Sequence, residues 1–433
     1  MNSIGAKLNM VDVWFPYGKT EVCVRIPARN FLGTIDPEEK PSMPADREEI
    51  ERALGMPLGS RNLGDIVEAE HKVAIVVDDV TRPAPSHIMV PPLLKELSSK
   101  GVKDENITII FGCGTHRAVT RQEAGRLLGE QVVNRISTIS HDYKAENQVY
   151  VGKTKKHGTE VHLNHVFAEA DIKILTGDIC FHYFAGYGGG RKSVLPAITA
   201  EETTRHNHLM LLHPKAKPGV LQGNPVHEDM VEAAKLAGVD FILNVVMNGK
   251  GEIVKALAGD LEMAFNEGTK LVDEMYRVHV DRKADIVVVG AGGHPADMNL
   301  FQAYKAVHNA LEVVKRDGVV ILVAECPEGH GSQVFYDWMV KFKDLKAVKK
   351  HIERKFVLGG HKAYYWLDAL EKVEIILVSS MPDYYAQNVF RLKTSRAIND
   401  AMNRAFTIAG KKAKILAMPQ GNLTLPEIEK ANS

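Results

Sequence analysis

The chain has 433 residues, with 54 Lys and Arg against 54 Asp and Glu, and a pI of about 7.3. Its length exceeds what one ordinary hydrophobic core holds, so two or three domains are expected. The balanced charge leaves no basic surplus for nucleic acid or for an anionic membrane surface. No apolar run approaches the roughly 20 residues of a spanning helix, and the N-terminus lacks the pattern of a signal peptide. The four cysteines are widely spaced with no CxxC motif. We therefore expect a reduced, cytoplasmic protein with neither nucleic acid nor membrane as a partner.

The first 70 or so residues predict short strands, loops and one polar helix, which opens after the prolines of PEEKPSMPADREEIERAL. An alternation of strands and helices then begins. Three continuous apolar runs are typical of strands buried in a parallel sheet, and they are KVAIVV (72–77), the run that begins ITIIFG (from 107) and ADIKILTGDI (170–179). The segment SHIMVPPLLKELSSKG predicts the helix between the first two strands. This pattern predicts an α/β fold with a mainly parallel sheet.

Polar side chains follow each of these three strands. Asp79 and Arg82 follow the first strand, His116 follows the second, and His182 and Lys192 follow the third. Ligands of open α/β sheets bind outside the carboxyl ends of the strands, so these side chains are expected to meet in one site.

The third strand leads into FHYFAGYGGGRKSVLPAITAEETTRHNH, a run that contains four glycines, Gly186, Gly188, Gly189 and Gly190. Glycine lets the backbone approach a ligand closely, and the amides of such a turn can cradle an anion. A Walker A loop counted from Gly186 needs glycine at position 191, where this sequence has Arg191. The run therefore argues against a P-loop NTPase.

The same run carries reactive side chains. Lys192 beside the cationic Arg191 could act as a covalent amine with a lowered pKa. Histidines at two strand ends could stand on opposite sides of a substrate as acid and base. His206 and His208 are two residues apart on a predicted helix, so at most one should face the site, and other ligands of a metal would come from a cofactor. That helix is expected to begin at Thr199 as N-cap, with Glu202 closing a capping box. Asn224 and Pro225 predict the start of another helix.

A second unit opens at about residue 280 with the strand and glycine-rich exit ADIVVVGAGGHPAD, followed by the helix LFQAYKAVHNALEVVKRDG. GVVILVAECPEG and VEIILVSS predict further strands. GAGG is not GxGxxG, because His294 and Pro295 replace the end of that motif, which disfavours a dinucleotide site. We expect one domain over 1–275 and a second over 280–408, with 412–433 as a candidate segment to return to the first.

Four motifs together resemble the nickel-pincer-dependent lactate racemase family, namely DDVTRP, GTHR, HYFAGYGGGRKSVLP and PADMNLFQAYKAVHNA. The resemblance runs from about residue 10 to about residue 420. It implies two α/β domains with mainly parallel, Rossmann-like sheets and an active site in the cleft between them. The first domain would hold cofactor and nickel, and the second would orient the substrate.

The resemblance also implies residue roles. Lys192 would form a thioamide with a nickel-pincer nucleotide, pyridinium-3-thioamide-5-thiocarboxylic acid mononucleotide, whose S, C and S atoms bind one nickel ion. A soft ligand set of this kind suits nickel in square-planar geometry. His208 would be the nickel ligand contributed by the protein, with His206 as the fallback, and His116 and His182 would be the paired acid/base residues.

Further positions match groups around the cofactor and the substrate. Asp79 and Arg82 would lie at both, and Gly188, Gly189 and Gly190 would contact the cofactor. Gln302, Lys305 and Trp366 would contact the substrate, the first two at its carboxylate. From the residues alone, Gln302 and Trp366 could equally be surface and packing residues, and Lys305 a solvated lysine.

The implied function is a racemase or epimerase that inverts C2 of a 2-hydroxy acid by hydride transfer to the cofactor. The host's cofactor-synthesis proteins would be partners. Phe301 stands where a tyrosine is expected in enzymes acting on lactate, so larger 2-hydroxy or sugar acids remain open as substrates. Two other classes also stay open, a non-enzymatic phosphate- or nucleotide-binding protein that uses the glycine turn, and an NAD-dependent dehydrogenase.

Overall fold

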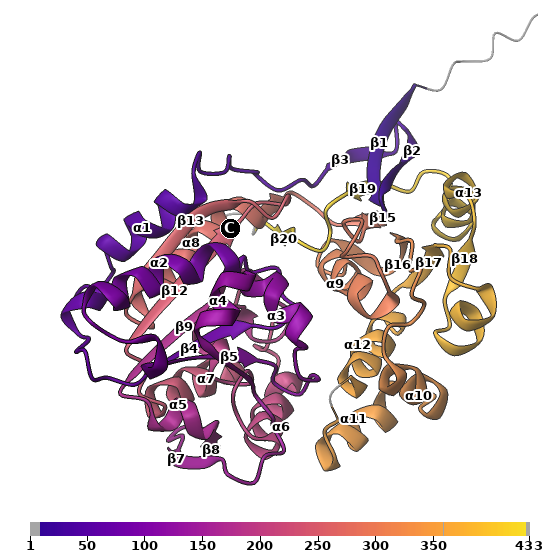
Figure 1. Cartoon of the computed structure of the whole chain (residues 1–433). Coiled ribbons are helices and arrows are strands. Elements are labelled where there is room, and N and C mark those ends of the chain that lie inside the picture. The colour runs from indigo at the N-terminus through magenta and orange to yellow at the C-terminus, as the bar shows by residue number, and fades with distance from the viewer. Residues whose placement is uncertain (1–8, 358, 430–433) are drawn as a thin grey trace, which may run out of the picture. The chain divides into compact units, whose positions relative to one another are not determined.

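The computed structural model describes residues 9–357 and 359–429, and these form two compact units (Figure 1). The N-terminal unit is Glu39–Met275, and the C-terminal unit combines residues 9–38 with 276–429. The expectation that the N-terminal domain begins at residue 1 is therefore wrong for residues 9–38. The proposed return of 412–433 to that domain is wrong for the described residues up to 429, because both segments pair with strands of the C-terminal unit.

The N-terminal unit is built on a six-stranded sheet, in the order β13 (Ile253–Gly259), β12 (Phe241–Met247), β9 (Ile172–Asp178), β4 (Val73–Asp78), β5 (Ile107–Gly112) and β6 (Ser137–Ser140). Every neighbouring pair is parallel except β12 with β13. The apolar runs of the sequence are thus confirmed as buried strands. They are buried on both faces because helices cover both sides of a parallel sheet. Two short antiparallel pairs complete the strands, β7 (Val149–Lys153) with β8 (Glu160–Leu163) and β10 (Phe181–His182) with β11 (Gly186–Tyr187).

The helices of this unit are α1 (Asp46–Gly55), α2 (Ser86–Ser99), α3 (Arg121–Leu128), α4 (Glu130–Arg135), α5 (His165–Glu169), α6 (Glu201–Leu209), α7 (Pro225–Leu236) and α8 (Met263–Tyr276), the last ending at the boundary. Short helical turns are η1 (Leu63–Asp65), η2 (Asp104–Asn106), η3 (Gly190–Ser193) and η4 (Met210–Leu212). Apolar residues of α1 to α4, including Ile50, Leu93 and Ala124, pack on one face of the sheet. Figure 1 shows α5, α6 and α7 on the side opposite α1 and α2.

Two predicted helix starts have different outcomes. Asn224 caps α7, since its side chain accepts from the amides of Val226 and His227 and Pro225 is the first helical residue, as predicted. The predicted capping box at Thr199 is wrong, because α6 begins one residue later with Ala200 as N-cap and no side-chain cap. The Thr199 hydroxyl is 3.0 Å from the Thr204 hydroxyl instead.

The C-terminal unit contains an all-parallel six-stranded sheet, in the order β18 (Lys393–Ser395), β17 (Glu374–Val378), β16 (Val314–Val323), β15 (Ala284–Gly290), β19 (Ile415–Met418) and β3 (Phe31–Thr34). The hairpin β1 (Met10–Tyr17) and β2 (Thr20–Pro27) packs with α13 (Ile398–Ala409) on one face. The remaining elements are β14 (Arg277–Val280), which pairs with β20 (Leu425–Ile428), the helices α9 (Leu300–Ala310), α10 (Gln333–Lys341), α11 (Leu345–Arg354) and α12 (Gly360–Leu370), and the π-helical turn η5 (Tyr385–Val389). Helix α9 ends earlier than predicted, because Val314 already pairs with Ala284 in the sheet.

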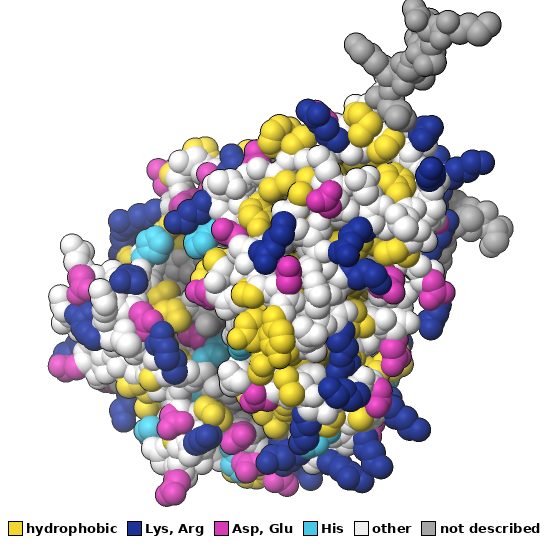
Figure 2. Space-filling model, turned by 90° about the vertical axis from the view of Figure 1, so that its right-hand side faces the viewer, with side chains coloured by type: hydrophobic (Ala, Val, Ile, Leu, Met, Phe, Trp, Pro, Cys, Tyr) yellow, Lys and Arg dark blue, Asp and Glu magenta, His cyan; other side chains and the backbone are white. Residues whose placement is uncertain are grey.

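The surface agrees with the balanced composition. Lys and Arg side chains are interspersed with Asp and Glu over the face shown in Figure 2. Within the described ranges, no helix combines the length and apolar character that crossing a membrane requires.

Candidate active site

The polar residues that follow β4 and β5 meet at the carboxyl edge of the N-terminal sheet. The two strands are parallel neighbours, and the His116 Nδ1 atom lies 2.6 Å from Asp79 Oδ2. The backbone amide and the hydroxyl of Thr81 both donate to Asp79 Oδ1, at 3.0 and 2.6 Å. The predicted convergence of Asp79 and His116 is therefore present.

The Asp79 carboxylate determines which ring nitrogen of His116 carries the proton. Burial disfavours the charged carboxylate, but the hydrogen bonds from His116 and Thr81 outweigh it and hold the pKa of Asp79 below its ordinary value. An ionised carboxylate can only accept, so Nδ1 of His116 must donate. The Nε2 atom of neutral His116 then carries a lone pair and can accept a proton.

His182 has the opposite arrangement. It lies on β10, opposite Gly186 of β11, and its Nδ1 atom accepts from the backbone amide of Ala185 at 3.2 Å. A backbone amide can only donate, so neutral His182 carries its proton on Nε2. That nitrogen lies 3.4 Å from Lys192 Nζ. The structure therefore brings His182 and Lys192 together, as expected.

Lys192 lies in the short turn η3 and is partly buried. Its pKa is lowered well below the ordinary value, first by burial and then by the positive charges of Arg82 and Arg191. The sequence predicted that Arg191 would lower the pKa of Lys192. The structure adds a second cation with the same effect, the exposed Arg82. A neutral amine is the nucleophilic form of lysine, so Lys192 is suited to covalent attachment.

Arg191 holds the backbone that presents Lys192. Its side chain is 1% exposed and lies over the Phe265 ring, with the guanidinium carbon 4.3 Å from the ring centroid. It donates to the carbonyls of Ala185 and Gly189, at 2.8 and 3.1 Å, and to His227 Nδ1 at 3.0 Å. Burial lowers the pKa of Arg191 to about 9. Arg191, which departs from the Walker A pattern, therefore stabilises the glycine turn through hydrogen bonds to its backbone carbonyls.

The glycine turn does not form the expected anion cradle with its Gly188 and Gly190 amides. Gly188 N donates to the carbonyl of Cys180 at 2.7 Å, and Gly190 N donates to Asn244 Oδ1 at 2.8 Å. Glycine is still required sterically, because a Cβ on Gly186 would lie 2.4 Å from the carbonyl oxygen of Val220. The sequence interpretation overlooked Asn244, whose only signal is one amide in the apolar run FILNVVM.

His208 and His206 separate as their spacing predicted. His208 on α6 is 3% exposed, whereas His206 is exposed. Burial and the charge of Lys192 lower the pKa of His208 to about 3, so its imidazole stays neutral and keeps a lone pair, as a metal ligand must. In the part of the chain that the structure describes, no group of three or more His, Cys, Asp or Glu side chains could hold a metal. A metal at His208 would need its other ligands from a bound molecule.

A pair of carboxyl groups adds to the charge of this site. Asp78 ends β4 and Asp178 ends β9, next to it in the sheet. Burial and the neighbouring Asp178 raise the pKa of Asp78 to about 7, with Arg82 acting in the opposite direction. The raised pKa of Asp78 means that this carboxyl carries less negative charge near pH 7 than an exposed aspartate does.

The predicted substrate residues lie in the C-terminal unit. Gln302 and Lys305 are one turn apart on α9, with Gln302 half-buried and Lys305 exposed. Trp366 on α12 is completely buried, its Nε1 donates to the carbonyl of Phe390 at 3.1 Å, and its ring centroid is 5.2 Å from that of Tyr304. These contacts make Trp366 a packing residue within this unit.

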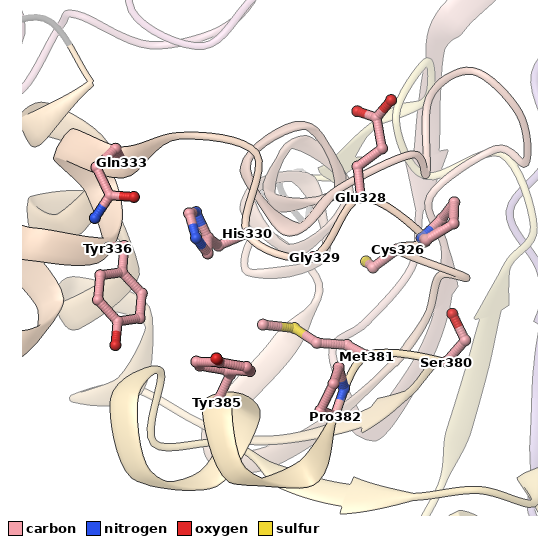
Figure 3. A pocket seen from close by; sticks show the side chains of 11 residues that line it. Cys326, Glu328, Gly329, His330, Gln333, Tyr336, Ser380, Met381, Pro382 and Tyr385 are labelled. Carbon is pink, nitrogen blue, oxygen red and sulfur yellow. The ribbon is translucent and has the colours of Figure 1, made fainter.

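Two further pockets in the structure were not predicted from the sequence. One, of about 440 Å³, opens at the carboxyl ends of β16 and β17, with Tyr336, Tyr385 and Met381 among its walls (Figure 3). It contains none of the predicted site residues. The other, of about 280 Å³, lies in the N-terminal unit beside Arg191 and His227.

Comparison with known proteins identifies both parts of the chain. Residues 17–219 match the model of the lactate racemase N-terminal domain, and residues 279–424 match that of the lactate racemase C-terminal domain. The lactate racemase of Thermoanaerobacterium thermosaccharolyticum is 34% identical over 95% of this chain and 98% of its own length. That of Lactiplantibacillus plantarum is 33% identical over 95% and 99%.

Solved structures agree with this assignment. The lactate racemase apoprotein of T. thermosaccharolyticum superposes with a TM-score of 0.90 at 31% identity, covering 97% of this chain and 100% of that one. A Thermotoga maritima protein, with a TM-score of 0.68 at 18% identity over 90% and 100%, shares the fold. Identity above 30% over nearly the full length decides against the two alternative classes, the non-enzymatic binding protein and the NAD-dependent dehydrogenase. The chain belongs to the lactate racemase family and is an isomerase.

Proposed function

We propose that this isomerase inverts C2 of a 2-hydroxy acid, either lactate or a larger 2-hydroxy or sugar acid, with a nickel-pincer nucleotide joined to Lys192. The observation that carries the proposal is the pair of histidines with opposite hydrogen-bonding roles. His116 presents a lone pair at Nε2, while His182 presents an N–H beside the amine of Lys192. Inversion at one carbon needs an acid/base group on each side of it, which a single histidine does not supply.

The residues around Lys192 fit this cofactor chemically. The lowered pKa of Lys192 favours the neutral amine that the covalent linkage requires. The pKa of His208 is lowered to about 3, chiefly by burial, so its imidazole is neutral and has a lone pair for a metal. Lys192 and His208 would hold the group, through a covalent bond and a nickel–nitrogen bond respectively. When bound, the cofactor would supply a pyridinium ring that takes hydride from C2 of the substrate and returns it.

His116 would remove the hydroxyl proton of one enantiomer. Its Nε2 atom accepts the proton, and the imidazolium that forms is stabilised by the Asp79 carboxylate, 2.6 Å from Nδ1. Asp79 also fixes the ring orientation, since Thr81 holds its other oxygen. This pairing keeps the lone pair of His116 directed away from Asp79.

His182 would serve the opposite face of the planar keto acid. To give a proton from Nε2 as an imidazolium, it must also carry one on Nδ1, which requires breaking the 3.2 Å contact with the amide of Ala185. Ala185 is buried, so leaving its amide without an acceptor costs about 1–3 kcal/mol. On the C-terminal unit, Gln302 and Lys305 would hold the substrate carboxylate.

Intact-mass analysis tests the covalent step. Protein made in a host that synthesises the cofactor should carry an adduct, and Lys192→Ala should lack it. Lys250→Ala removes an exposed lysine as a matched control and should keep the adduct. If adduct-bearing, nickel-loaded protein interconverts no enantiomers or epimers in a panel of 2-hydroxy acids, the proposed function is wrong.

A further inference from the structure

The orientation of His208 depends on contacts between α6 and the rest of the N-terminal unit. Helix α6 has nine residues and no side-chain cap at its N-terminus. A helix this short is marginal in isolation, so packing against its neighbours has to fix its position. The His208 ring meets the Phe184 ring edge-on, with 5.1 Å between the centroids. The Phe184 carbonyl accepts from the side chain of Asn224, the residue that caps α7, at 2.9 Å. Helix α7 therefore holds the segment against which His208 packs.

Helix α7 also carries a completely buried carboxyl group, that of Asp229. Its Oδ1 atom accepts from the Thr154 hydroxyl at 2.7 Å, and its Oδ2 atom accepts from the Thr159 hydroxyl at 2.9 Å. These two threonines flank the loop between β7 and β8. The third donor is the side-chain amide of Asn207 on α6, 2.9 Å from Oδ2. Asp229 therefore joins α7 to both α6 and the hairpin β7–β8, which lie beside it in Figure 1.

Asn207 immediately precedes His208 in α6. It is completely buried, and its side-chain nitrogen donates to two groups of α7, the Asp229 carboxyl and the carbonyl of Val226, the latter at 3.1 Å. Two bonds to one neighbouring helix fix the rotation of α6 about its own axis. Successive residues of an α-helix are about 100° apart, so a rotation that moved Asn207 would turn the His208 ring as well. Breaking either bond would leave a buried polar group without a partner, which makes the arrangement hard to deform.

We propose that Asp229 is a positioning residue, which acts through Asn207 to hold the His208 imidazole in the orientation that a nickel–nitrogen bond requires. This inference rests on the proposed function, because it takes His208 as the nickel ligand. Groups outside the ligand sphere of a metal orient its ligands and keep the metal bound. A positioning role differs from general stabilisation in what it changes, namely how long nickel stays bound rather than whether the chain folds.

Nickel release from adduct-bearing protein tests the proposal. Asp229→Asn keeps the size of the side chain but places an amide, with its own hydrogens, among the three donors. Protein whose Lys192 adduct is verified by intact mass is exposed to EDTA, and the nickel that remains is measured over time. We expect nickel to leave this variant about tenfold faster than wild type, at the lower end of the loss that follows mutation of outer-shell groups. The absorption spectrum of the bound nickel should change as well, because it depends on the direction of the imidazole.

Two variants in the same unit are matched controls. Glu49→Gln alters another buried carboxyl, which accepts from Arg52 and from the Ala256 amide instead of from α6. Thr154→Val removes the hydrogen bond to Asp229 Oδ1 from the hairpin and leaves the Asn207 contact in place. Nickel release from both should stay within about twofold of wild type, since neither change touches the link to α6.

Asn207→Ala breaks the same link from the other side, and it carries the test if Asp229→Asn does not fold. It should speed nickel release as Asp229→Asn does. The double variant should release nickel little faster than either single one, because the two residues act as one unit. The thermal midpoint of each unloaded full-length variant shows whether it folds.

Two results would overturn the inference. One is nickel release at the wild-type rate in these variants, and the other is an equal acceleration in Glu49→Gln, which would show a general loss of stability instead. His208→Ala separates the inference from the proposed function. If His208→Ala loses nickel while Asp229→Asn keeps it, Asp229 has no positioning role and the proposed ligand stands. If adduct-bearing His208→Ala retains nickel as wild type does, the proposed ligand is wrong and the inference fails with it.

Discussion

His116 and His182 are the same side chain placed in two different backbone settings. His116 follows β5 and meets the Asp79 carboxylate that follows the neighbouring strand β4. His182 lies on the short hairpin β10–β11 and meets the amide of Ala185 three residues further along the chain. A carboxylate accepts and an amide donates, so the two rings carry their protons on opposite nitrogens.

The difference shows how a fold can make two identical residues chemically unequal. The partner of His116 comes from another strand, so the register of the parallel sheet determines its state. The partner of His182 is local and depends on the conformation of one turn. The proposed inversion uses both states, a base on one face of the carbon and an acid on the other.

The strongest way to break the comparison is to remove each histidine. His116→Ala and His182→Ala should each lower interconversion by about 10²–10⁴-fold in both directions, because the proposed mechanism uses both faces in every turnover. The double variant should be little worse than either single one, because residues that act as a unit are not additive. Rates are measured by chiral chromatography with the adduct verified by mass.

A single-turnover assay distinguishes the two residues. His116→Ala should still form keto acid from the enantiomer that His182 serves, and His182→Ala from the other. Full steady-state activity in either variant, with cofactor bound, would show that the substituted histidine takes no part in proton transfer.

Asp79→Asn sharpens the comparison by turning the acceptor beside His116 into an amide that can also donate. Neutral His116 can then adopt the other tautomer, with its proton on Nε2 and its lone pair on Nδ1. The imidazolium also loses its countercharge, so we expect activity to fall by about 10–10²-fold. Thr81→Val, which removes one hydrogen bond to Asp79 but keeps the carboxylate, should cost less than about tenfold. Because enantiomers are equal in energy, kcat/KM must fall equally in both directions. A drop in one direction only would contradict racemisation.

Arg191→Met tests the local setting of His182. The variant leaves the carbonyls of Ala185 and Gly189 without their buried donor, so we expect the free energy of unfolding to fall by about 2–4 kcal/mol. Because Ala185 also donates to His182, the ¹⁵N shifts of the His182 ring should move as well, while those of His116 stay. Arg191→Lys keeps the charge but not the fork of donors and should recover only part of the stability. Wild-type stability in the Met variant would show that the glycine turn does not depend on the hydrogen bonds from Arg191.

The smallest effect concerns pH. The folded-state pKa of Asp79 is lowered, so its contribution to stability is present above its ordinary pKa of about 3.9 and is lost as pH falls through the folded value. The stability difference between wild type and Asp79→Asn should therefore shrink as urea unfolding is repeated from about pH 7 to about pH 3. A difference that grows toward acid would mean that the carboxylate is not stabilised by His116.

Much of the N-terminal sheet was predictable from the sequence alone. Strands β4, β5 and β9 are continuous apolar runs, and a buried parallel strand demands such a run whatever surrounds it. The meeting of Asp79 with His116 followed from the same rule, because the carboxyl ends of parallel strands lie along one edge. The separation of buried His208 from exposed His206 needed only the period of a helix.

The tertiary structure alone decided features that depend on partners distant in the chain. Residues 9–38 join the C-terminal unit because Gly33 of β3 pairs with Leu416 of β19, and no local pattern announces a pairing across such a separation. The amide of Gly190 is engaged by Asn244, 54 residues away, which removes it from the expected anion cradle. Lys362 of α12 has the sequence context of an ordinary helical lysine, but the structure buries it and places its amine 4.7 Å from the Phe301 ring centroid and 5.0 Å from that of Tyr304. In each case the environment of a residue is set by a neighbour that is distant in the chain. Sequence spacing does not identify that neighbour, because only folding brings the two residues together.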